Sequence, residues 1–328
     1  MSCVDVTVRK VAVVAIGRNE GDRLAKCLRS VKAIGALVVY VDSGSTDGSV
    51  AMARGAGIDV VELDSGIPFT AARARKEGFE RVLRLVPDLS YVQFVDGDCE
   101  VLTGFTETAI AFLDSHRDVA VVCGRLRERH PHQSIYNRVC DIEWNAPPGE
   151  TDVCGGNALM RVDAVERVGG YRADLIAGEE PELCTRLRAA GWRVWRLDVE
   201  MVLHDAAMIR FGQWWWRAVR SGYGNAQHAH LFGTVSRRWE WLRAWLWGVW
   251  LPVACLALGV ALGPWGWTSW LIYPLQWLRQ TLRKPGPLSQ RALLALFQLA
   301  SRFPECWGQI RFMRERFLGR QRRLIEYK

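Results

Sequence analysis

Asp96 and Asp98 are separated by a single glycine and directly follow an apolar segment at residues 91–95. Two carboxylates this close together at the end of a strand can share one divalent cation, and such a cation can neutralise a diphosphate. The pattern alone is weak evidence, because about one Asp-x-Asp is expected by chance in a chain of this length and ordinary composition. Its position directly after a hydrophobic segment strengthens the prediction of a site for a metal and a phosphate.

A second polar loop, at residues 42–49, also follows an apolar segment. The carboxylate of Asp42 can accept hydrogen bonds from a base or a ribose, and small residues such as Ser43 let a ligand approach the backbone. The same residue types are also preferred in turns and at helix N-caps. The loop is therefore either a ligand site or the cap of the helix that follows it.

Three acidic residues, Glu179, Glu180 and Glu182, open a predicted helix in which Pro181 stands early, where its missing N–H is tolerated. A carboxylate in this position can act as the general base for an acceptor hydroxyl. Acidic residues at a helix N-terminus also complement the helix dipole without any catalytic role. The sequence leaves both interpretations open.

The elements that position these loops alternate between short β-branched segments and segments with the period of a helix. Strands are expected at residues 11–16, 37–41, 58–63, 91–95 and 119–123, and helices at residues 24–31, 46–56, 71–85 and 105–113. This alternation predicts an α/β fold with a mostly parallel sheet covered by helices on both faces. Ligands of such sheets bind at the carboxyl ends of the strands, where the loops after residues 41 and 95 lie.

The chain has 328 residues, and its formal net charge of +8 is concentrated at one end. From residue 279 onward, twelve Lys and Arg stand against three Glu, so the rest of the chain is nearly neutral and nucleic-acid binding is not indicated. Nine cysteines are scattered without a CxxC motif, as is typical of reduced, buried cysteines. The first ten residues lack the apolar core of a signal peptide, and we expect a cytoplasmic catalytic part.

Tryptophan becomes frequent after residue 200, and no charged residue occurs between Arg243 and Arg279. Residues 244–262 are long enough to cross a bilayer, whereas residues 267–278 suffice only for a partial crossing or an interfacial helix. The alternative is a buried helical hairpin of a soluble domain. Because basic residues beside an apolar segment favour the cytoplasmic face, we expect a re-entrant hairpin turning at residues 263–266. An amphipathic helix over residues 289–323 is then expected on the anionic inner surface of the membrane.

Five motifs occur in one order along residues 9–225: Gly-Arg-Asn-Glu at 17–20 with the Asp42 loop, Ala-Arg-Lys-Glu-Gly at 74–78, Asp-Gly-Asp at 96–98, Gly-Gly-Asn at 155–157, and Gly-Glu-Glu at 178–180. This ordered set resembles family 2 glycosyltransferases. The resemblance implies the GT-A fold, a nucleotide-sugar donor, a divalent metal (Mg²⁺ or Mn²⁺) and inversion at the anomeric carbon. The implied enzyme is similar to hexosyltransferases of polysaccharide biosynthesis, and its acceptor is a glycan or a lipid-linked hydroxyl compound.

The resemblance also assigns roles by position. The residues that it places at the nucleotide sugar are Arg18, Asn19, Glu20, Asp42, Ser43, Arg75, Asp96, Gly156 and Asn157. Asp98 is expected to hold the metal with Asp96 nearby, and His204 to complete the metal shell or to touch a phosphate. A purely structural histidine is the alternative for His204.

The expected catalytic base is Glu180, which stands where the family usually has an aspartate, with Glu179 or Glu182 as alternatives. Lys76 replaces the asparagine that is usual after the arginine of its motif. Gln213 and Arg217 lie in a segment similar to the Gln-x-x-Arg-Trp region of processive members, although the spacing differs by one residue. They could bind the acceptor and the pyrophosphate, whereas a Trp-rich membrane-interface anchor is an equally good interpretation.

We therefore expect a catalytic domain over residues 1–230 and a membrane-associated helical region over residues 231–328. Two other functions remain open at this point. A sugar nucleotidyltransferase would require a Gly-rich basic signature near the N-terminus, which residues 15–19 do not provide. A non-catalytic membrane scaffold that retains the fold is disfavoured by the intact set of Asp96, Asp98 and Glu180.

Overall fold

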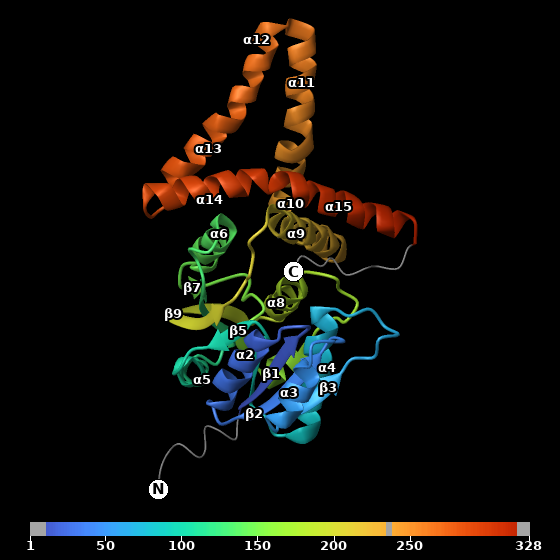
Figure 1. Ribbon diagram of the computed structural model, residues 1–328, viewed down its shortest axis with the longest axis vertical. Helices are drawn as coiled ribbons and strands as arrows, with labels where there is room; N and C mark the ends of the chain where they lie inside the picture. The colour runs from blue at the N-terminus through green and yellow to red at the C-terminus, as the bar shows by residue number, and fades with distance from the viewer. Residues whose placement is uncertain (1–10, 234–237, 320–328) are drawn as a thin grey trace. The chain divides into compact units, whose positions relative to one another are not determined.

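The computed structural model describes residues 11–233 and 238–319 (Figure 1). The chain divides into two compact units. The first runs to His130 and resumes over Trp144–Ala206, and the second comprises Pro131–Glu143 and the chain from Ala207 onward. These units do not divide the chain near residue 230. The domain boundary expected there stays a prediction.

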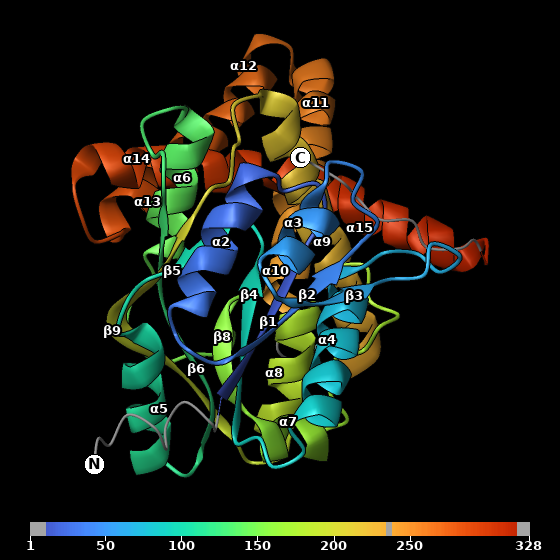
Figure 2. The same cartoon turned by 60° about the horizontal axis from the view of Figure 1, so that its bottom comes forward.

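The first unit is built on a sheet of nine strands with the order β3-β2-β1-β4-β8-β6-β9-β5, and β7 pairs with β9. The strands are β1 (Val11–Gly17), β2 (Leu37–Asp42), β3 (Asp59–Glu62), β4 (Tyr91–Asp96), β5 (Cys99–Val101), β6 (Val119–Glu128), β7 (Gly149–Glu150), β8 (Ala158–Arg161) and β9 (Arg193–His204). Strands β3, β2, β1 and β4 are mutually parallel, whereas β8 runs antiparallel to β4 and β6. Figure 2 shows β1, β4 and β8 side by side at the centre of this unit.

Helices connect these strands and cover the sheet. They are α2 (Asp22–Lys32), α3 (Ser49–Gly55), α4 (Ala71–Leu85), α5 (Phe105–Ser115), α7 (Val162–Arg167) and α8 (Glu179–Ala189). Helix α2 buries Leu24, Cys27, Leu28 and Val31, which recur at helical spacing on one face. The mixed α/β fold with a central sheet flanked by helices is confirmed.

Helix α4 packs directly against the sheet because of a glycine. A Cβ atom on Gly78 would lie only 2.3 Å from Cγ1 of Val14 on β1 and 2.9 Å from Cγ2 of Val41 on β2. Thr70 is the N-cap of this helix, and its hydroxyl accepts a hydrogen bond from the N–H of Arg73. This close packing fixes the position of Arg75, one turn before Gly78.

The cysteines of the described residues are free and buried, as the sequence predicts for reduced core cysteines. Cys3 lies outside the described residues.

The second unit is helical. It contains α6 (Ile135–Trp144, its last residue counted with the first unit), α9 (Phe211–Phe232), α10 (Arg238–Trp245), the π-helical turn η1 (Leu246–Trp250), α11 (Leu251–Leu262), α12 (Pro264–Trp267), the 3₁₀ turn η2 (Thr268–Leu271), α13 (Ile272–Arg283), α14 (Leu288–Ala300) and α15 (Arg302–Phe317). Helices α9 and α15 approach each other closely because Gly222 and Gly308 lie at their crossing. A Cβ atom on either glycine would come within 2.0 Å of a carbonyl oxygen of the other helix.

Helices α10 and α11 are continuous through η1 and form an apolar helix over Trp239–Leu262, long enough to cross a membrane; no other described helix meets that criterion. The chain then turns back at residues 263–266, as expected. The hydroxyl of Tyr273 on α13 donates to the carbonyl oxygen of Trp247 in η1 at 2.6 Å, which ties the returning arm to the first one. Figure 1 shows the arms α11 and α13 joined through α12.

The single amphipathic helix expected over residues 289–323 is instead two helices, α14 and α15, which meet at Ser301, and its last part lies outside the described residues. Pro304 explains the break. Its missing N–H cannot bond to the carbonyl of Ala300, and its ring would clash with that group in a continuous helix. The hydroxyl of Ser301 then bonds to Gln298 and Glu305 across the junction.

Candidate active site

The polar loops of the first unit meet because neighbouring parallel strands end at the same level. Gly17 at the end of β1 lies opposite Asp42 of β2, and Ile16 lies opposite Asp96 of β4. The loops that follow these three strands therefore share one edge of the sheet.

The loops after β1 and β2 are held together by hydrogen bonds. Asn19, which has a positive φ of 54°, donates its backbone N–H to Oγ of Ser45 at 2.9 Å and accepts from the N–H of Thr46 at 2.7 Å. The N–H of Gly21 donates to Oδ2 of Asp47 at 3.0 Å. These contacts form a polar wall beside the carboxyl ends of the strands.

Two further side chains of the first loop have partners nearby. The guanidinium of Arg18 lies over the ring of Phe69, 5.5 Å from its centre. Glu20 forms an ion pair with Arg23 at 2.8 Å. Contact of Arg18 and Glu20 with a nucleoside stays a prediction.

Asp42 is buried, with an exposed fraction of 1%, and its carboxylate shapes its own loop. Oδ2 accepts from the N–H groups of Gly44 and Ser45, and Oδ1 accepts from the hydroxyl of Tyr40 at 2.9 Å. Burial and the neighbouring Asp42 charge raise the pKa of Tyr40, which keeps that hydroxyl a donor. The structure thus gives Asp42 the turn-forming role that the sequence left open. Contact of Asp42 and Ser43 with a nucleoside stays a prediction.

Arg75 of α4 connects three segments of the site. Its Nη2 donates to Oδ1 of Asp96 at 2.6 Å and to the carbonyl oxygen of Gly156 at 3.3 Å, and its Nη1 donates to Oε1 of Glu179 at 2.5 Å. The side chain also lies over the ring of Tyr171. Burial by itself would lower the pKa of Arg75, but the charges of Asp96 and Glu179 outweigh it and raise that pKa. Arg75 therefore remains a buried cation between two carboxylates.

Gly156 and Asn157 fix the position of Asp96. The amide of Asn157 accepts from the backbone N–H of Asp96 at 3.0 Å and donates to its Oδ2 at 3.3 Å. A Cβ atom on Gly156 would lie 2.6 Å from Nη2 of Arg75 and 2.6 Å from Oδ2 of Asp96. Only glycine leaves room for the ion pair at this point.

Asp98, Cys99 and His204 form a second cluster, with one potential ligand atom of each residue within 4.8 Å of the others. Nε2 of His204 lies 3.0 Å from Oδ2 of Asp98, and the ring of Trp144 stacks on the imidazole at 4.4 Å. The pairing of β5 with β9 places Cys99 directly opposite His204. Two of the three residues that the sequence assigns to the metal, Asp98 and His204, are thus together, whereas Asp96 pairs with Arg75.

The donor atoms of this cluster fit a divalent cation such as Mg²⁺ or Mn²⁺. A buried carboxylate and an imidazole supply oxygen and nitrogen ligands, which suit Mn²⁺ in particular. Burial raises the pKa of the Cys99 thiol well above its usual range, so this group remains a neutral thiol and a weak ligand. Cys99 and Trp144 carried no separate signal in the sequence, because only the strand pairing brings them to His204.

The three acidic residues of α8 differ in their surroundings. Glu179 is buried and bound by Arg75, and Glu182 is bound at both carboxylate oxygens by Arg186, at 2.8 and 2.6 Å. Glu180 is half-buried. Gly178 is the N-cap of the helix, and its φ of 76° lets the chain turn into the helix.

Gln213 and Arg217 belong to the second unit and have local partners there. Oε1 of Gln213 accepts from the N–H groups of Ile209 and Arg210 and so caps the start of α9. Arg217 pairs with Glu143 at 3.1 Å. Binding of the acceptor or the pyrophosphate by these two residues stays a prediction.

Solved structures show which class of protein has this architecture. The mannosyltransferase PcManGT from Pyrobaculum calidifontis, solved with GDP-Man and Mn²⁺, matches 91% of this chain and 87% of its own at 17% identity, with a TM-score of 0.59. Residues 1–349 of TarS from S. aureus match 92% of both chains at 15% identity, with a TM-score of 0.52. The first unit therefore has the GT-A fold of glycosyltransferases.

Sequence comparisons point to the same class of enzyme. Residues 12–169 match the family described as Glycosyl transferase family 2. The succinoglycan biosynthesis protein ExoA of Rhizobium meliloti is 31% identical over 126 residues, which are 32% of this chain and 37% of that protein. The glycosyltransferase AglE of Haloferax volcanii is 25% identical over 300 residues, covering 88% of this chain and 90% of AglE. The family match and these relatives support a family 2 glycosyltransferase, an enzyme of glycosyl transfer.

Proposed function

We propose that this enzyme moves a sugar from a nucleoside diphosphate donor to the hydroxyl group of a lipid-linked or polysaccharide acceptor, with inversion at the anomeric carbon. The observation that carries the proposal is the Arg75 ion-pair network. It ties Asp96 at the end of β4, Gly156 before β8 and Glu179 of α8 into one site beside Asp98 and His204.

A divalent cation, Mg²⁺ or Mn²⁺, would be held by Asp98 and His204, with Asp96 nearby. When bound, it would neutralise the charge of the departing nucleoside diphosphate. The complex of PcManGT with GDP-Man and Mn²⁺ supports this proposal for a chain of the same fold. The polar wall formed by Asn19 and the loop after Asp42 lies at the same sheet edge and would hold the nucleoside.

Glu180 is the proposed general base. It stands at the start of α8, where the family that the sequence resembles has the aspartate of its Glu-Asp pair, directly after Glu179, which Arg75 binds. Glu180 would take the proton of the acceptor hydroxyl as that oxygen forms a bond to the anomeric carbon. The bond to the diphosphate oxygen breaks on the opposite face of the sugar, which inverts the configuration.

The hairpin of the second unit supports a location at the cytoplasmic face of a membrane. Its apolar side chains are exposed to an extent unusual for a soluble protein, with Val260 and Trp265 each 82% exposed. An anionic membrane surface would attract the basic residues that follow from Arg279 onward. Nucleotide sugars are made in the cytoplasm, so the catalytic unit would lie on the same side.

The donor assignment can be tested by incubating the full-length protein with a panel of nucleotide sugars and measuring nucleoside diphosphate release with Mn²⁺ and with EDTA. We expect release from at least one donor only when metal is present. Release that is the same in EDTA would overturn the metal assignment. A folded protein that releases nucleotide from no donor would favour the scaffold alternative.

The membrane location is tested separately. We expect the protein to stay with membranes at high salt, and a cysteine introduced at Lys328 to resist an impermeant reagent in intact cells. Release by salt alone would contradict insertion, and labelling at this position would contradict the hairpin.

A further inference from the structure

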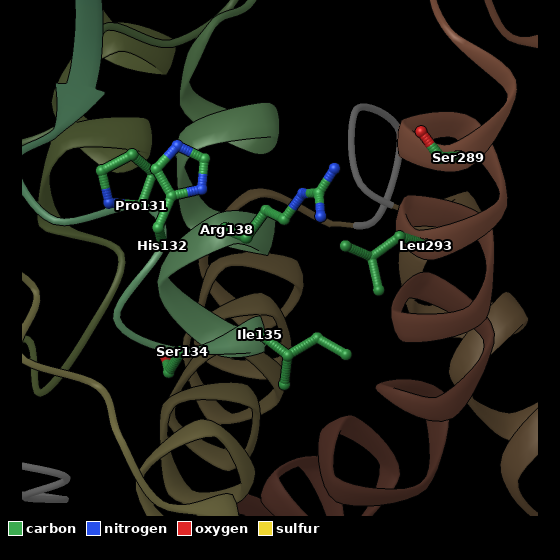
Figure 3. A pocket seen from close by; sticks show the side chains of 7 residues that line it. All are labelled: Pro131, His132, Ser134, Ile135, Arg138, Ser289 and Leu293. Carbon is green, nitrogen blue, oxygen red and sulfur yellow. The ribbon is translucent and has the colours of Figure 1, made fainter.

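The second unit contains a pocket of about 410 Å³ between α6 and α14, which no role described so far uses. It is lined by Pro131, His132, Ser134, Ile135, Arg138, Ser289 and Leu293. Figure 3 shows Arg138 extending from α6 toward α14, with Ile135 and Leu293 on the two sides of the gap. The pocket thus combines one guanidinium and one imidazole with an apolar floor.

The charge of this pocket is one-sided. No acidic residue lines it, and within residues 11–233 and 238–319 the guanidinium of Arg138 has no hydrogen-bond or ion-pair partner. The first turn of α14, which contains Ser289, adds to this charge. Its N-cap is Pro287, without a side-chain cap, so the first N–H groups of the helix keep their partial positive charge. Both walls therefore favour an anion.

The walls of the pocket are held in place by contacts outside it. The hydroxyl of Ser134 accepts from the N–H of Asn137 at 3.0 Å and donates to the carbonyl oxygen of Met208 at 2.5 Å. The ring of Phe297, one turn after Leu293, packs edge-to-face against Tyr136 of α6 at 5.9 Å. Contacts outside the pocket therefore connect the elements that form its walls.

Apolar surface continues from the pocket to the hairpin. On α14, Leu288 and Leu296 are 61% and 52% exposed. The indole N–H of Trp277 on α13 donates to the carbonyl oxygen of Ala292, which is adjacent to Leu293. A hydrocarbon chain attached to an anion in the pocket would thus find apolar side chains along α14.

From these features we infer that the pocket binds the phosphate group of a lipid, with Arg138 as its main anionic contact and Ile135 and Leu293 against the first part of the hydrocarbon chain. A phosphate matches the fork of donors that a guanidinium presents. The same chemistry occurs in a bilayer phospholipid and in a phosphorylated lipid that carries or receives sugar. Only the second source depends on the proposed function.

The test measures binding of two phosphate lipids, dioctanoyl phosphatidic acid and farnesyl phosphate, to the detergent-purified full-length protein by calorimetric titration, without donor or metal. Dioctanoylglycerol, farnesol and inorganic phosphate serve as matched probes. We expect Arg138→Gln and Ser289→Glu to weaken binding of the phosphate lipids by about tenfold or more. Both positions are exposed, so these variants should fold. Arg314→Gln, an equal loss of charge at an exposed position of α15, should bind as the wild type does.

Binding of both phosphate lipids would identify a bilayer headgroup site, and a strong preference for farnesyl phosphate would identify a lipid carrier. Equal binding by wild type and Arg138→Gln, equal binding of farnesol and farnesyl phosphate, or no binding at all would overturn the inference. Asp98→Ala should bind the lipids normally, which separates a failure of this inference from a failure of the proposed catalysis.

Discussion

Replacing Arg75 by Met removes the cation at the centre of the site while keeping a side chain of similar length. Glu179, whose side chain is 8% exposed, then loses its guanidinium, and Asp96, at 29% exposed, loses the same partner. Removing one partner of a buried ion pair typically costs about 3–5 kcal/mol, because the remaining charge is left without compensation. We expect Arg75→Met to lower the free energy of unfolding by an amount in this range. Most of that loss should come from Glu179, because Asp96 is partly solvated.

Arg73→Met is the matched control, since Arg73 is an equally buried arginine on the same helix. Its acidic partner Glu77 is 35% exposed, so that ion pair is screened by solvent. Its other contacts are the carbonyl oxygens of Asp64 and Ile67, whose loss costs about 1–3 kcal/mol. This variant should lose less stability and keep its turnover per folded molecule.

The assay follows thermal unfolding by tryptophan fluorescence in one detergent and measures sugar transfer per folded molecule. Arg75→Met should show the lower midpoint of unfolding and a large loss of transfer even where it is fully folded. If the two variants lose stability equally, or if folded Arg75→Met transfers sugar at the wild-type rate, the network does not organise the site.

Three further predictions follow from the same geometry. Glu180→Gln should lower turnover by about a hundredfold or more while leaving donor binding unchanged. Glu182→Gln should chiefly lower stability. If Glu182→Gln stops turnover and Glu180→Gln does not, the base is misassigned. Gly156→Ala should reduce sugar transfer because the added Cβ atom displaces the Arg75–Asp96 ion pair. Gly155→Ala, at a φ of 76° in open space, should lower stability by about 1 kcal/mol and leave transfer nearly unchanged. Equal transfer rates of the two variants would contradict this. Val260→Glu should reduce flotation with liposomes, and unchanged flotation would argue against insertion of the hairpin.

The order of strands and helices in the first unit could be predicted because each segment carries its own signal. Apolar runs such as residues 91–95 form buried strands, and the spacing of Leu24, Cys27 and Val31 marks one helix face. The motifs of the loops could also be assigned to one family. These features depend on neighbours in sequence, which a single chain displays directly.

Partners of the side chains could not be predicted in the same way. Arg75 bonds to residues 21 and 104 positions away, and His204 reaches Asp98 only through the pairing of β5 with β9. The binding of Glu179 by Arg75 depends on such a distant contact, whereas Glu182 is bound by Arg186 one turn further along the same helix. The capping role of Gln213 was hidden because its partners, the N–H groups of residues 209 and 210, carry no sequence signal.

The most direct test of the account compares Mn²⁺ binding and donor turnover in wild type, Asp98→Ala and Asp163→Ala. Asp98 is buried beside His204, whereas Asp163 is an exposed acid of α7 and serves as the control. We expect Asp98→Ala to fold, to lose Mn²⁺ binding measured by calorimetry and to release no nucleoside diphosphate, while Asp163→Ala behaves as wild type. Metal-dependent transfer by Asp98→Ala at the wild-type rate would contradict the proposed site.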